Sequence, residues 1–149
     1  MKRHFPFLAA LALVPGCDSP PPEPKVTVEG AVVTLPAVPG RASSAYFRLR
    51  TNNDPTRLVS IESPRVGRFE LHETVSEGGV SRMRPLQQAT FSPDEPLAFE
   101  PGARHAMVFD IDPAVRAGDR LPLTFRFDPA PPVTVDAEVR GPGAGHAAH

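Results

Sequence analysis

Apolar and polar side chains alternate through the middle of the chain in short segments of the β type. In residues 45–51 the apolar side chains of Ala45, Phe47 and Leu49 are two positions apart, and in residues 68–75 Phe69 and Leu71 form the apolar side. Such a period of two places successive side chains on opposite faces of a strand. Strands are predicted at Val26–Thr34, Ala45–Thr51, Arg57–Ile61, Arg68–Val75, Val80–Arg84, His105–Ile111, Leu121–Phe127 and Val133–Val139.

Turn-forming sequences separate these segments, among them Asn52-Asn53-Asp54-Pro55, Glu77-Gly78-Gly79 and Ala117-Gly118-Asp119. The 20 prolines are spread along the chain, which disfavours long helices. Beyond one turn at Pro113–Arg116, no helix is expected. Seven to eight short strands at this spacing predict an all-β fold, either a β-sandwich or a Greek-key barrel.

The N-terminal residues have the composition of an export signal. A basic start at Met1–Arg3 precedes an apolar run, Phe5–Val14, which is shorter than the ~20 residues needed to span a bilayer. The run ends in Leu-Val-Pro-Gly-Cys, which resembles a bacterial lipobox. We therefore interpret residues 1–16 as a signal peptide and Cys17 as a lipidated membrane anchor. An ordinary secretory signal followed by an incidental cysteine is the alternative.

The remaining boundaries follow from composition. Residues 17–25 contain four prolines after the cysteine and predict an extended tether. Residues 26–140 are expected to form one domain, and residues 141–149 a disordered tail that carries His146 and His149. The predicted location is the periplasm, with the domain held at a membrane.

Charge and cysteine content exclude several classes of protein. The net charge is −1, from 16 basic and 17 acidic residues, so the chain lacks the basic excess of a nucleic-acid-binding protein. A single cysteine, Cys17, allows neither an internal disulfide nor a cysteine-rich zinc site. We expect a monomer.

Two histidines and two methionines interleave along the predicted strands, in the order His72-x10-Met83-x21-His105-x-Met107. His72 lies on the polar face of its segment. His105 and Met107 share a face, roughly 6.6–6.8 Å apart along a strand. Met83 lies between two arginines, a poor place for a residue that only fills a core. From the residues alone, one shared metal site and four unrelated side chains both stay open.

The residue types decide which metal such a site would take. Thioethers are soft and neutral, and they select Cu(I) over zinc, calcium or magnesium. The lack of a thiolate excludes a blue-copper electron-transfer site. Methionine also suits an oxidising compartment, because it forms no disulfide.

The spacing and its flanks resemble the periplasmic copper chaperone family called PCuAC. The matching segments are Ala45-Tyr46-Phe47, Leu71-His72-Glu73-Thr74, Arg82-Met83-Arg84-Pro85 and His105-Ala106-Met107, within residues 28–139. The resemblance implies a cupredoxin-like β-barrel. It also implies one Cu(I) ion bound by His72, Met83, His105 and Met107. That ion would be delivered to the dinuclear CuA centre in cytochrome c oxidase subunit II, or to another copper-accepting protein. Glu73 stands where many relatives have a further methionine.

Other functions stay open at this point. The chain is also compatible with copper buffering or resistance without a client, or with a metal-free, anchored binding module. An enzyme is disfavoured, because the chain has no nucleophile-elbow sequence. His146 and His149 in the tail suggest a weaker, secondary site for Cu(II).

Overall fold

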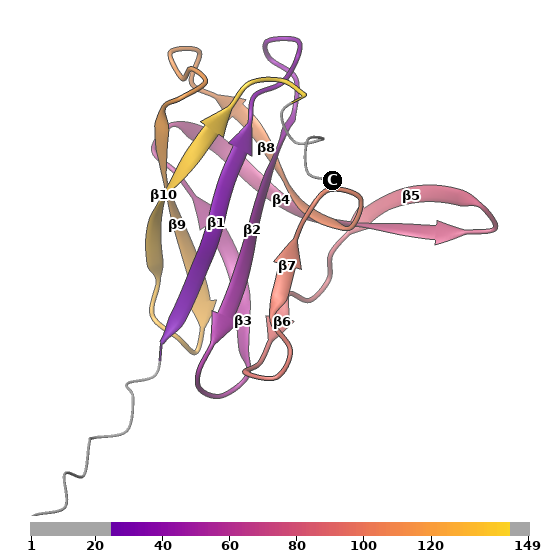
Figure 1. The fold of residues 1–149 in the computed structure, drawn as a ribbon, viewed down its shortest axis with the longest axis vertical. Helices are drawn as coiled ribbons and strands as arrows, with labels where there is room; N and C mark the ends of the chain where they lie inside the picture. Colours follow the sequence, from indigo (N-terminus) through magenta and orange to yellow (C-terminus); the bar gives the residue numbers. More distant parts are fainter. Residues whose placement is uncertain (1–24, 144–149) are drawn as a thin grey trace, which may run out of the picture.

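The computed structural model describes residues 25–143 and folds them into ten strands without a helix (Figure 1). The strands are β1 (Val26–Thr34), β2 (Ser43–Thr51), β3 (Thr56–Glu62), β4 (Val66–Glu77), β5 (Val80–Pro85), β6 (Thr90–Phe91), β7 (Leu97–Phe99), β8 (Arg104–Ile111), β9 (Arg120–Asp128) and β10 (Val133–Arg140). None of these residues forms a helix that could cross a membrane. The predicted all-β class is confirmed.

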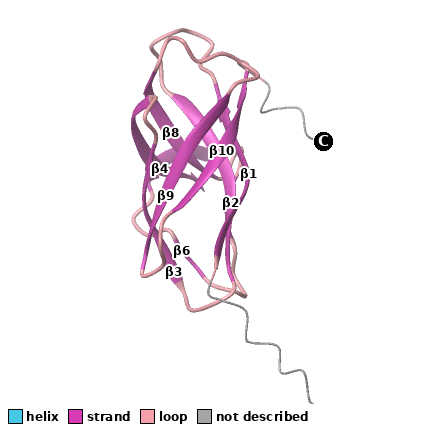
Figure 2. Cartoon of the chain, turned by 90° about the vertical axis from the view of Figure 1, so that its left-hand side faces the viewer, coloured by secondary structure: helices cyan, strands magenta, loops and turns pink. Residues whose placement is uncertain are grey.

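All strands belong to one sheet in the order β5-β4-β8-β2-β1-β10-β9-β3-β6, with β7 paired to β2. Strand β1 joins the two halves of this sheet, because it pairs antiparallel with β2 and parallel with β10. The register of β1 against β2 shifts between Glu29 and Val32, next to Gly30 at φ 60°. This irregularity bends β1, and the two halves lie over each other in side view (Figure 2).

All eight predicted strands form, with ends within two residues of those expected. The structure adds β6 and β7, which have two and three residues and are too short to show a periodic pattern. They still contribute to the core, because Phe91, Leu97 and Phe99 are buried. Within the segment Pro113–Arg116 a turn forms at Pro113 and Ala114, closed by a hydrogen bond of 2.9 Å from the amide of Val115 to the carbonyl of Asp112.

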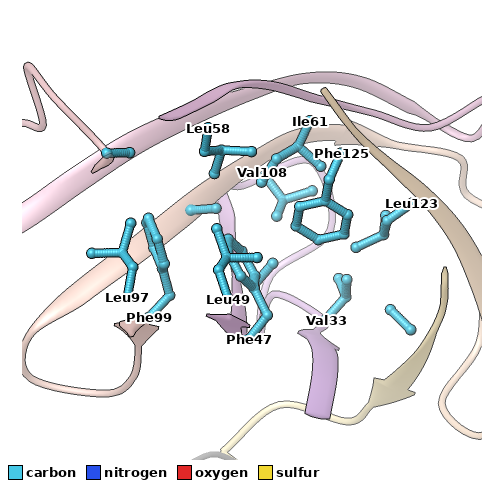
Figure 3. Packing of buried hydrophobic residues seen from close by; sticks show 14 of the residues in the cluster. Val33, Phe47, Leu49, Leu58, Ile61, Leu97, Phe99, Val108, Leu123 and Phe125 are labelled. Carbon is cyan, nitrogen blue, oxygen red and sulfur yellow. The ribbon is translucent and has the colours of Figure 1, made fainter. Parts of the chain in front are cut away.

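Aromatic rings join the two halves of the sheet in the core (Figure 3). Phe47 of β2 stacks on Phe99 of β7, with ring centroids 4.4 Å apart, and meets Phe125 of β9 edge-on at 4.9 Å. Offset-stacked and edge-on contacts are the arrangements that aromatic rings prefer. These buried rings fix the barrel from which β4 and β8 present their outer face.

The end of β4 leaves the barrel as a hairpin with β5 (Figure 1). Residues 66–73 of β4 pair with β8, whereas residues 74–77 pair with β5 alone. Gly78 and Gly79 form the turn, both at positive φ (58° and 79°), a backbone conformation that glycine adopts without strain. Every residue of β5 is exposed. The hairpin is therefore held by the barrel at its base only.

Strands β4 and β8 leave no room for a side chain at Gly67. A Cβ atom added there would lie 2.8 Å from the Cβ of Asp110, which itself has φ 55°. Neither backbone can move freely at this point, because the ladder continues on both sides between Val66–Ile111 and Arg68–Phe109.

Gly67→Ala is therefore expected to destabilise the fold by about 1–3 kcal/mol, the range for overpacking. Asp110→Gly removes both the facing Cβ and the strained conformation, so the double variant should recover most of the loss. Urea unfolding of the three variants and the parent chain measures this. Additive effects of the two substitutions would contradict the proposed close contact.

Candidate metal centre

His72 and His105 face each other across β4 and β8. They are direct partners in the antiparallel register, and their ring centroids are 5.9 Å apart. The neighbouring pair in the ladder is Leu71 and Ala106. Its side chains point to the opposite side of the sheet, where Ala106 is fully buried in the core. Because side chains alternate along a strand, both imidazoles lie together on the outer face of the barrel.

Met107 lies next to this pair. It follows His105 by two residues on β8, on the same face, and its partner on β4 is Glu70. Its side chain is half-buried. A spacing of two residues separates the Cα atoms by about 6.8 Å, so the thioether of Met107 and the ring of His105 can reach one ion between them.

Met83 lies on the far side of the histidine pair. Met83 is paired with Thr74, which lies two residues after His72 on β4. Met107 is paired with Glu70, which lies two residues before His72. In a regular sheet this register corresponds to roughly 16 Å between the Cα atoms of the two methionines. Met83 is 61% exposed on the projecting hairpin. The structure thus gathers His72, His105 and Met107, and leaves Met83 at the rim.

His105 is held in a state that suits a metal ligand. It is only 8% exposed. Burial lowers its pKa, the charge of His72 adds to the decrease, and a hydrogen bond to the backbone of Ala103 opposes it. A metal needs the neutral imidazole, and this environment keeps His105 neutral to lower pH than a free histidine.

Glu70 and Arg68 complete the outer face beside the histidines. The Oε2 atom of Glu70 lies 3.3 Å from Nε2 of His72, and its Oε1 atom accepts a hydrogen bond of 3.0 Å from Nε of Arg68. Arg68 also lies over the ring of Phe109, 4.0 Å from its centroid. Sequence analysis missed both residues, although positions 68, 70 and 72 share one face of an alternating segment.

Residues 25–143 contain no group of three or more His, Cys, Asp or Glu side chains that could hold a metal ion. The donors that the structure brings together are two imidazoles, those of His72 and His105, with Met107 next to them on β8. This donor set fits a soft ion and does not fit zinc, calcium or magnesium. Cys17, His146 and His149 lie outside the described residues, so their predicted roles stay predictions.

A family model named LpqE-like, which describes a lipoprotein family, matches residues 26–139. The chain belongs to the LpqE-like family. In this LpqE-like chain the matched region includes all four predicted ligands. It covers all ten strands except the last residue of β10.

Solved structures of PCuAC domains share its fold. The copper-bound PCuAC domain from PmoF2 is 21% identical with a TM-score of 0.66, covering 79% of this chain and 94% of that domain. The solution structure of CuI-DR1885 from Deinococcus radiodurans is 24% identical with a TM-score of 0.62, covering 85% of this chain and 83% of that one. The predicted resemblance to PCuAC and the cupredoxin-like fold are thereby confirmed.

One curated relative, the "Uncharacterized protein RP573" of Rickettsia prowazekii, is 34% identical over 107 residues. The match covers 70% of this chain and 55% of that protein, so the chain spans about half the length of this relative.

The lowered pKa of His105 predicts how the stability of the metal-free protein depends on pH. The unfolded chain takes up a proton at His105 near pH 6.5, whereas the folded chain takes it up only at lower pH. Stability should therefore fall as the pH falls from about 7 to 5. Urea unfolding across this range measures the slope, and His105→Gln should flatten it. An equal slope in parent and variant would contradict this assignment.

Proposed function

We propose that this LpqE-like domain binds one Cu(I) ion with His72, His105, Met107 and Met83, and that it acts as an extracytoplasmic copper chaperone. One observation carries the proposal: the β4–β8 register sets two imidazoles face to face with a thioether beside them. Two of the structures that share the fold are described as copper-bound and CuI forms, which supports the choice of metal.

The exposure of the ligands suggests how copper would be held and released. His105 is buried and neutral, and so forms the fixed part of the site with its partner His72. Met83 must approach from the projecting hairpin, and it completes the site when the hairpin bends toward β8. Withdrawal of Met83 would open one coordination position toward solvent. An acceptor could then enter at the exposed rim without displacing the buried ligand.

Substituting the methionines tests the ligand set. Leucine keeps the approximate volume of methionine and removes the sulfur, so the fold should survive. Met107→Leu and Met83→Leu should each weaken Cu(I) binding, and the double variant should weaken it most. An anaerobic Cu(I) competition titration gives stoichiometry and affinity, with thermal unfolding as the control for the fold.

Unchanged affinity in the double variant would contradict the proposed site. Unchanged affinity in Met83→Leu alone would instead leave a three-coordinate site of His72, His105 and Met107, and would show that the hairpin does not close on the ion.

The proposed acceptor is the CuA centre of cytochrome c oxidase subunit II. Neutral thioethers and imidazoles bind Cu(I) without the charge attraction of thiolates, so transfer to a centre with bridging thiolates should be favourable. Mixing the Cu(I)-loaded chain with the reduced, metal-free copper domain of subunit II should move copper to that domain. If copper stays on this chain at equilibrium, buffering or resistance becomes the better assignment.

Membrane attachment through Cys17 is part of the proposal. Its support is the lipobox-like sequence before Cys17 and the lipoprotein description of the family. The tether of residues 17–25 would then place the copper domain close to membrane-bound clients in the periplasm. His146 and His149 would add a weaker Cu(II) site, because two imidazoles without a thioether suit that ion.

A further inference from the structure

Three charged or polar side chains follow one another on the outer face of β4. Arg68, Glu70 and His72 alternate with inward-pointing residues, so they lie in a row. The guanidinium Nε of Arg68 donates to Oε1 of Glu70 at 3.0 Å, and Oε2 of Glu70 lies 3.3 Å from Nε2 of His72. The two carboxylate oxygens of Glu70 therefore each have a different partner.

This row determines which ring nitrogen of His72 carries the proton. An ionised carboxylate only accepts hydrogen bonds, so Nε2 of His72 must be the donor. A neutral imidazole has one N–H, and its other nitrogen has the free lone pair. With the proton on Nε2, the nitrogen available to a metal is Nδ1.

Glu70 is itself held in place from the other side. Arg68 lies over the ring of Phe109 at 4.0 Å and has a second, longer contact of 3.8 Å to Asp110. Stacking on an aromatic ring restrains a guanidinium that is otherwise exposed. The orientation of His72 thus depends on a chain of contacts that begins on β8.

We propose that Glu70 is a positioning residue of the copper site, which holds Nε2–H of His72 and directs Nδ1 to the ion. This inference rests on the copper-binding function proposed above. The ring of His105 is held in a similar way, because it hydrogen-bonds to the backbone of Ala103. Metal-binding histidines commonly donate their second nitrogen to a carboxylate or carbonyl oxygen in this way.

The first test uses the metal-free full chain. Long-range 1H–15N correlation spectra at about pH 8, where imidazoles are neutral, distinguish the two tautomers of each histidine. His72 should be the Nε2–H tautomer in the parent chain and a mixture of both in Glu70→Ala. A parent chain with the proton of His72 on Nδ1 would overturn the inference.

The second test measures Cu(I) affinity by competition. Glu70→Ala should lose about tenfold, the lower end of the range for such partners, because Glu70 is partly exposed. Glu70→Gln should lose less, since its amide oxygen can still accept from Nε2–H. Glu138→Gln is the matched control: Glu138 lies on β10, is about as exposed as Glu70, and accepts from Arg140 at 3.1 Å.

Unchanged affinity in Glu138→Gln, together with the graded losses at position 70, supports the inference. A higher affinity in Glu70→Ala would overturn it, because Glu70 would then compete with copper for Nε2. If the parent chain binds no Cu(I), the proposed function fails. The NMR spectra of the metal-free chain would still show which nitrogen of His72 carries the proton. If copper binds normally and Glu70→Ala changes neither tautomer nor affinity, this inference alone fails.

Discussion

The antiparallel register of β4 against β8 is the constraint on which the other features depend. It sets Leu71 opposite Ala106 toward the core and His72 opposite His105 toward the outside. Because side chains alternate with a period of two, a slip of one residue would send the imidazoles inward and the apolar pair into water. Burial of the core therefore also fixes the distance between the two histidines. The proposed metal centre needs no packing of its own to stay assembled.

The four predicted ligands differ in how firmly the fold holds them. His105 and Met107 lie on β8, which is paired on both sides, and His72 lies where β4 still has β8 as a neighbour. Met83 lies on a strand that pairs only with β4 and has every residue exposed. The proposed site would thus have three ligands held within the barrel and a fourth on the exposed hairpin, an arrangement suited to a protein that binds an ion and later releases it.

Much of this architecture is visible in the sequence. Eight strands were predictable, because alternation, valine-rich runs of five or more residues and the turn sequences between them are local properties. Strands β6 and β7 were not, since two or three residues form strands only where the rest of the sheet receives them. Alternation also placed His72 on the outer face. It could not place His72 opposite His105, because that pairing depends on contacts between segments 33 residues apart in the chain. Nor could it show that the pairing of β4 with β5 and with β8 separates Met83 from Met107.

Strand β5 is an open edge of the sheet, and this has a consequence for solubility. Its outward backbone groups could pair with the edge of another molecule and so begin aggregation. Arg82 and Arg84 flank Met83, and Pro85 ends the strand. Charged side chains on an edge strand disfavour pairing with another strand, and proline removes a backbone donor. The residues beside the exposed Met83 thus protect this edge of the sheet against self-association.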